Sequence, residues 1–144
     1  MPTILRQVNI ISRSASLYRS GRLHDSELGG CHHSYILAIC SHPGISGEEL
    51  AGRICVNKSN VARNLSYLEE HGYVRREQSK EDKRVTLCYP TEKMLGVLPQ
   101  VRKISEEWNS LVTEDLTEEE KSQLSVLLNK VAAKAREYGE KNKL

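Results

Sequence analysis

The residues with the clearest chemical potential lie between residues 52 and 68, a stretch that contains three basic side chains and no acidic one. Lys58, Ser59, Asn60 and Arg63 fall within this stretch. Arginine can donate two parallel hydrogen bonds to guanine and asparagine can pair with adenine, while serine and lysine bind phosphates. The same residue types also occur on ordinary solvated helix faces, so the elements that carry them must decide between these interpretations.

The charge of the whole chain hides this local asymmetry. The protein has 144 residues with 21 Lys and Arg against 19 Asp and Glu, a formal net charge of +2. Residues 51–90 carry eight basic and five acidic side chains, whereas residues 91–144 carry nine and ten. A basic middle between more acidic ends indicates an anionic partner for the middle segment.

Several classes of protein are disfavoured by what the motifs lack. No apolar run approaches the roughly 20 residues of a membrane span, and residues 1–11 do not resemble a signal peptide. The sequence shows no Gly-rich phosphate loop and no recognisable set of paired carboxylates, so we expect neither an enzyme nor a bound cofactor. We expect a cytoplasmic protein with reduced cysteines and no membrane partner.

Helix signals surround the basic stretch. A short helix over residues 35–40 is followed by a break at 42–44, and Ser46 can cap a second helix with Glu49 at its third position. Asn57 can cap a third helix that ends near residue 70, where Gly72 follows at a position that favours glycine.

The third of these helices is expected to have two faces, and a hairpin follows it. At 100° per residue, Val61, Leu65 and Leu68 lie within about 60° of one another, which predicts a buried stripe, and Ser59, Arg63, Ser66 and Glu70 point roughly opposite to it. Residues 73–78 and 84–89 alternate apolar and polar side chains around a charged tip, as in a β-hairpin. Helix, turn, helix and hairpin together predict a winged helix-turn-helix.

Four motifs lie between Gly44 and Lys93: Gly-Ile-Ser at 44–46, Asn-Lys-Ser-Asn-Val-Ala-Arg at 57–63, Leu-Glu at 68–69 before Gly72, and Asp-Lys-Arg at 82–84. With these motifs, the segment resembles the MarR family of winged-helix regulators. The resemblance implies a homodimer on double-stranded DNA, with Arg84 in the minor groove. It also implies that Asp82 orients the wing by pairing with a nearby arginine, for which Arg75 or Arg76 is the local candidate. The expected DNA-binding residues are Ser46, Lys58, Ser59, Asn60, Arg63, Arg75, Arg76, Lys83 and Arg84.

Long amphipathic helices are predicted at both ends of the chain. Apolar residues recur at spacings of three and four from Ile4 to Tyr18, from Val97 to Leu111 and from Leu124 to Tyr138. Thr117 and Glu120 are spaced as a capping box. Pro99 should bend the second of these segments or mark a late start. Pro90-Thr91 stands where the family has Leu-Thr at the entry to this helix.

We call these three apolar helix stripes seams, and together they predict the organisation of the chain. The fold class is mainly α with a small β-hairpin wing: residues 1–30 form an N-terminal dimerisation helix, 31–90 the winged helix-turn-helix and 91–144 C-terminal dimerisation helices. An intramolecular helical bundle is the alternative use of the same seams. In a dimer, two recognition helices would face half-sites about 34–36 Å apart, hence a pseudo-palindromic operator.

The resemblance also implies a sensory site. The family implies a small aromatic or phenolic effector, for which Tyr18, Arg22, His32, Tyr35 and Ile39 are the candidate lining residues; structural roles for Arg22 and His32 are the alternative. Cys31 lies beside two histidines, and an adjacent imidazolium can make a thiol more reactive. Three other cysteines, at 40, 55 and 88, are interpreted as small core residues, and no spacing fits a metal site.

The expected function is therefore a transcriptional repressor that binds its operator as a homodimer and is released by a small-molecule effector. A winged-helix protein-interaction module and a thiol-based redox regulator using Cys31 are the alternatives.

Overall fold

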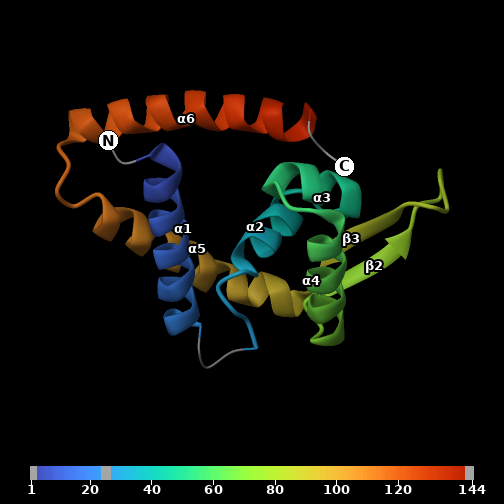
Figure 1. The fold of residues 1–144 in the computed structure, drawn as a ribbon. Coiled ribbons are helices and arrows are strands. Elements are labelled where there is room, and N and C mark those ends of the chain that lie inside the picture. The colour runs from blue at the N-terminus through green and yellow to red at the C-terminus, as the bar shows by residue number, and fades with distance from the viewer. Residues whose placement is uncertain (1–2, 24–26, 142–144) are drawn as a thin grey trace. The chain divides into compact units, whose positions relative to one another are not determined.

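A computed structural model describes residues 3–23 and 27–141 (Figure 1). The chain divides into two compact units, the first extending to Trp108 and the second beginning at Asn109. Mostly helical structure with a small antiparallel sheet confirms the predicted fold class. None of the described helices is long and apolar enough to cross a membrane.

The first unit begins with α1 (Ile4–Arg22) and α2 (His33–Ser41), followed by α3 (Gly47–Ile54) and α4 (Lys58–Glu70). The predicted caps are confirmed, because the amide of Glu49 donates to Ser46 Oγ at 3.1 Å and that of Asn60 donates to Asn57 Oδ1 at 2.7 Å. These side chains satisfy backbone donors that the first helical turns leave unpaired.

The turn between α3 and α4 departs from one prediction. Cys55 adopts a left-handed backbone conformation with φ of 56° and its side chain is exposed, so it is not a core residue. A left-handed residue ends α3 and lets the chain reverse into α4. Cys88 is fully buried as predicted, and Cys40 is half-buried.

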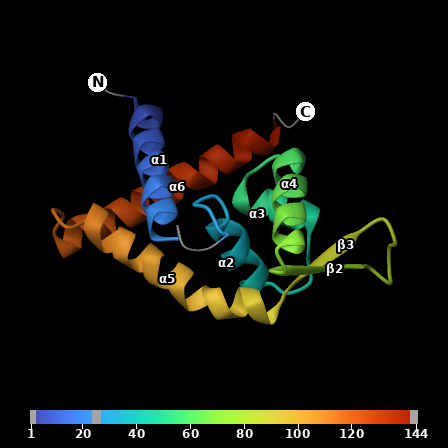
Figure 2. The same ribbon diagram turned by 90° about the horizontal axis from the view of Figure 1, so that it is seen from below.

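The hairpin consists of β2 (Val74–Gln78) and β3 (Thr86–Pro90), and it projects beyond α4 (Figure 2). A third strand, β1 (Ile45–Ser46), pairs with the other edge of β3, giving the order β1-β3-β2. Ile45 lies opposite Cys88, and Arg76 lies opposite the same cysteine from β2. The strand β1 was not predicted, because two residues are too few to show alternation.

The helix α5 (Glu92–Val112) runs through Pro99, so the late start considered from the sequence is wrong. Thr91 explains the early start: its Oγ1 accepts from the amide of Met94 at 3.3 Å and donates to the carbonyl of Gly72 at 2.6 Å. One side chain therefore caps α5 and anchors it to the end of α4.

In the second unit, α6 (Glu118–Lys141) begins at the predicted capping box. The amide of Glu120 donates to Thr117 Oγ1 at 3.1 Å, and the amide of Thr117 donates to Glu120 Oε2 at 2.9 Å. No residue of α6 is buried within this chain.

The core lies in the first unit, between α2, α3, α4 and the sheet. Its fully buried side chains are Ile36, Ile39, Leu50, Leu68, Cys88 and Met94. By contrast, α1 buries only Ala15 of its predicted seam and exposes Ile4, Val8 and Ile11. The core thus rigidifies the region around α4 and leaves terminal apolar residues in water.

Candidate nucleic-acid interface

The helix α4 has the two faces that its sequence predicts. Val61, Leu65 and Leu68 are buried, whereas Lys58, Ser59 and Arg63 are exposed. The exposed residues occupy the first two turns, where the free amides of a helix N-terminus add to the attraction for a phosphate. This surface, the exposed face of α4, carries a cationic and hydrogen-bonding set suited to nucleic acid.

Asn60 lies on the inner edge of this face and is half-buried. Its Oδ1 accepts hydrogen bonds from the hydroxyl of Tyr35 at 2.5 Å and from Nδ2 of Asn64 at 3.0 Å. Sequence reasoning placed Tyr35 in an effector site and missed Asn64. The spacing of four between the two asparagines on one helix was the available signal.

The tip of the wing is built around Asp82. Its carboxylate accepts from the backbone amide of Arg84 at 3.0 Å, and from Nε and Nη2 of the same residue at 3.1 and 3.2 Å. The Arg84 guanidinium, followed by its backbone amide, lowers the pKa of Asp82. Arg84 is still 89% exposed, so the carboxylate fixes the direction of a cation that faces solvent.

The two preceding arginines have other partners. Arg75 pairs with Glu77 and lies 4.7 Å from the ring centre of Tyr89, and Arg76 Nη2 donates to Glu69 Oε1 at 2.7 Å. The prediction that Arg75 or Arg76 pairs with Asp82 is therefore wrong. The side chains of neighbouring residues in a strand point to opposite faces of the sheet, so those of Arg75 and Arg76 do not extend along the strand to the hairpin tip.

The pairing of Arg76 with Glu69 links the wing to the end of α4. Hydrogen bonding to Arg76 lowers the pKa of Glu69, and the same contact raises that of Arg76. From the sequence, Glu69 was predicted only as part of a family motif, because Glu69 and Arg76 come together through tertiary packing.

Ser46 occupies an interior position. It is 7% exposed, its Oγ accepts from the Glu49 amide and donates to Glu49 Oε1 at 3.2 Å, and its backbone pairs with Leu87. Ser46 belongs to the helix cap, and the structure does not bring it to the exposed face of α4. Lys83, at the wing tip, is exposed.

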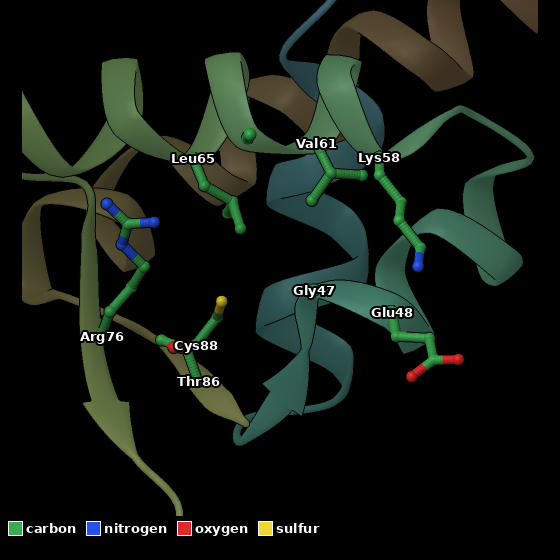
Figure 3. A pocket seen from close by; sticks show the side chains of 9 residues that line it. Gly47, Glu48, Lys58, Val61, Leu65, Arg76, Thr86 and Cys88 are labelled. Carbon is green, nitrogen blue, oxygen red and sulfur yellow. The ribbon is translucent and has the colours of Figure 1, made fainter. Parts of the chain in front are cut away.

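A pocket of about 320 Å³ lies between α4, the start of α3 and the sheet (Figure 3). Val61, Leu65 and Cys88 supply apolar walls, and Lys58 and Arg76 extend from opposite sides. Burial raises the pKa of Cys88 to about 11, so its thiol is neutral and behaves as a small apolar group.

An open hollow of about 680 Å³ lies on the other flank of α4. Its lining includes His32, Asn60, Arg63 and Tyr67. The rings of His32 and Tyr67 stack with centres 4.8 Å apart, and the amide of Gly29 donates to His32 Nδ1 at 2.9 Å. Tyr67, which no sequence motif singled out, therefore supports this wall.

The five predicted effector-lining residues do not lie together around one site. Tyr18 donates to Glu107 Oε2 at 3.3 Å and accepts from Arg22 at 3.0 Å, and its ring centre lies 5.4 Å from that of Trp108 with the two rings tilted by 41°. Tyr35 and Ile39 are core residues with 2% and 0% exposure, and His32 lies at the hollow beside α4. Arg22 contacts Tyr18 and Glu107, the kind of contact that a structural role for this residue implies.

A thiol sensor at Cys31 was predicted from the two adjacent histidines, and the structure does not support their activating role. Burial, with a contribution from Arg19, lowers the pKa of His33 to about 4. Burial also lowers the pKa of His32. Both rings are neutral at pH 7 and supply no imidazolium to activate the exposed thiol. Within the described residues, no three His, Cys, Asp or Glu side chains are grouped to hold a metal ion.

Comparisons with known proteins agree with this architecture. The profile of the MarR family matches residues 32–86. The chain is 30% identical over 131 residues to YybA of Bacillus subtilis (strain 168), an uncharacterised HTH-type transcriptional regulator, covering 91% of this chain and 87% of the relative.

Two solved structures extend the match to nearly the whole chain. The crystal structure of the transcriptional regulator SlyA superposes with a TM-score of 0.95 at 28% identity, covering 99% of this chain and 100% of that one. A Listeria monocytogenes structure assigned to the MarR family and complexed with 26mer DNA has a TM-score of 0.91 at 25% identity, covering 100% and 98%. With its two-faced α4, its Asp-braced wing and these relatives, the chain belongs to the MarR family of winged helix-turn-helix transcriptional regulators.

Proposed function

We propose that this protein is a sequence-specific, double-stranded DNA-binding repressor that works as a homodimer in the cytoplasm. The observation that carries the proposal is the pairing of two exposed basic features in one unit, the face of α4 with Lys58, Ser59 and Arg63, and the wing-tip Arg84 held by Asp82. A helix of this kind fits the major groove, and an arginine fits the narrow minor groove with its enhanced negative potential. The relative solved with 26mer DNA supports the same partner.

The dimer is supported by the apolar residues at both ends of the chain. Residues 1–30 and 91–144 would supply the interface, since α1 exposes Ile4, Val8 and Ile11, and α6 exposes Leu124, Leu127 and Leu128. Exposed apolar sets of this extent are uncommon on monomers and typical of interaction surfaces. A two-fold dimer would present two α4 helices to a pseudo-palindromic operator and occlude it from other proteins.

Release by a small aromatic or phenolic effector forms the last part of the proposal. The hollow beside α4 shares Asn60 and Arg63 with the proposed DNA-binding face, so an occupant would compete with DNA. Benzoate titrated into the preformed DNA complex should dissociate it, whereas cyclohexanol should not. Dissociation by neither compound or by both would contradict an aromatic effector site of this kind.

The central proposal is tested by selecting duplexes from a random pool and measuring affinity for the selected site by fluorescence anisotropy. A complex with six or more phosphate contacts should lose about three powers of ten in affinity between 50 and 200 mM salt. An enriched inverted repeat and a steep salt dependence are expected. A protein-interaction module would enrich no sequence and show no salt-dependent DNA complex.

A further inference from the structure

Four side chains form a hydrogen-bonded cluster under the first turns of α4. Tyr35 reaches from α2 to Asn60 Oδ1 at 2.5 Å. Asn64 Nδ2 lies 3.0 Å from that oxygen and 2.9 Å from the backbone carbonyl oxygen of Asn60. The thiol of Cys31 donates to Asn64 Oδ1 at 3.9 Å.

The chemistry of these contacts fixes which way the Asn60 amide points. A backbone carbonyl only accepts, so the Asn64 atom beside it must be the amide nitrogen. The same nitrogen donates to the Asn60 side chain, which must therefore offer its oxygen. Turning the Asn60 amide over would place two NH₂ groups against each other and leave the hydroxyl of Tyr35 without this acceptor.

The cluster is held firmly because Tyr35 is only 2% exposed. Burial raises the pKa of Tyr35, so the hydroxyl keeps its proton and remains a donor. Both lone pairs of Asn60 Oδ1 are thus occupied by Tyr35 and Asn64. Among the described residues no hydrogen bond engages Asn60 Nδ2, which leaves two donor hydrogens for a ligand of the exposed face of α4.

We propose that Tyr35 and Asn64 act as positioning residues that restrict Asn60 to donating, so that Asn60 faces guanine or thymine in each half-site and discriminates against adenine. Adenine would require asparagine to donate to N7 and accept from N6 at once, and the accepting oxygen is already committed. Guanine presents two acceptors, N7 and O6, and thymine presents O4. This inference rests on the proposed DNA-binding function and reverses the adenine preference expected from the residue type alone.

The first experiment selects duplexes from one random pool with the wild-type protein, Asn60→Ala and Asn60→Asp. The position that loses its preference in Asn60→Ala should carry guanine or thymine in the wild-type site. Asn60→Asp replaces the outward donor by an acceptor of nearly the same shape, so this position should change to cytosine or adenine, with about tenfold discrimination.

The second experiment tests the positioning role. Tyr35→Phe frees one lone pair of Asn60 Oδ1 and should reduce discrimination against adenine several-fold at this position only. Tyr73→Phe is the matched control, because Tyr73 is 3% exposed and lies under the ammonium of Lys93, in a different part of the unit. It should leave every base preference unchanged. If Tyr35→Phe does not fold, the base preferences of Asn60→Ala and Asn60→Asp still decide the inference.

The outcomes separate this inference from the function on which it rests. Adenine at the position that Asn60→Ala relaxes, or an Asn60→Ala selection identical to the wild type, would overturn the inference and leave the DNA-binding function intact. Failure of the wild-type protein to enrich any sequence would overturn both.

Discussion

At the scale of single residues, Arg63 and Lys58 are both exposed in the first two turns of α4 and are expected to have different roles. Arginine can recognise guanine with two parallel hydrogen bonds, whereas lysine near the helix N-terminus neutralises a phosphate. The two substitutions therefore separate base recognition from backbone contact.

Arg63→Ala should weaken binding to the selected operator by about 1–3 kcal/mol and broaden the base preference at one position per half-site. Lys58→Ala should weaken binding to all sequences similarly and reduce the slope of log affinity against log salt. Both quantities come from anisotropy titrations on operator and scrambled duplexes. Loss of discrimination in Lys58→Ala alone would reverse the assignment.

Asp82 offers a test in which net charge and preorganisation of Arg84 predict opposite changes in DNA affinity. Asp82→Ala removes a negative charge, so electrostatics alone predict tighter DNA binding. Because the carboxylate holds the Arg84 guanidinium and its backbone amide, we expect affinity to fall several-fold instead. Glu81→Ala, at a neighbouring exposed position of the wing, is the charge-matched control and should bind at least as tightly as the wild type.

His33 should make folding stability depend on pH. Its folded pKa of about 4 lies below the ordinary value of 6.5, so the unfolded chain binds more protons between these values. The stability it confers is present above pH 6.5 and is lost as the pH falls toward 4. Allowing for the solvent screening of a half-exposed side chain, the loss between pH 7 and pH 5 is about 1 kcal/mol.

Urea unfolding of the wild type and His33→Asn at both pH values measures this contribution. The variant should lose less stability on acidification than the wild type by that amount. The control His42→Asn, at an exposed histidine, should lose as much stability between pH 7 and pH 5 as the wild type. Equal pH dependence of all three proteins would show that His33 titrates normally.

At the scale of elements, α3, α4 and α5 each begin at a side-chain cap and pack their inner faces into the core. Asn57 caps α4, Ser46 caps α3 and Thr91 caps α5. Arg76 and Glu69 then connect α4 to β2, and Thr91 connects α5 to the end of α4. These contacts hold α4 at its N-terminus, at its C-terminus and along its buried face, and so they fix the position of its exposed face.

Removing the cap of α4 should be felt in stability. Asn57→Ala leaves the Asn60 amide without its acceptor and should lower the free energy of unfolding by about 1 kcal/mol. Urea unfolding monitored by circular dichroism measures the change. Asn57→Asp keeps an accepting oxygen and should retain most of the free energy of unfolding that Asn57→Ala loses. An Asp variant as unstable as Asn57→Ala would rule out the cap as the cause.

At the scale of the whole molecule, the proposed dimer explains the modest apolar content of 38% together with exposed leucines in α6. Leu127→Glu would place a charge within the proposed interface. We expect the molecular mass from light scattering to fall to that of one chain, and operator affinity to fall about 100-fold as two-site binding is lost.

Gln123→Glu introduces the same carboxylate at another exposed position of α6 and should leave the mass of the dimer unchanged. A wild-type protein that scatters as a single chain would instead support an intramolecular use of the apolar seams. A Leu127→Glu variant that remains dimeric would place the interface elsewhere.

The sequence by itself determined the winged helix-turn-helix, the caps at Ser46, Asn57 and Thr117, and the two faces of α4. These features depend on side chains three or four positions apart, whose relation is set by helix periodicity. The exposure of Lys58 and Arg63 followed from the same rule.

Only the tertiary structure decided how the polar side chains pair. Asn60 meets Tyr35 from another helix, Arg76 selects Glu69 over Asp82, and Tyr18 with its neighbour Arg22 turns to Glu107. The strand β1 likewise exists only because β3 lies beside it. Such pairings join residues far apart in the chain, and their hydrogen bonds depend on packing and side-chain conformation that no local periodicity specifies.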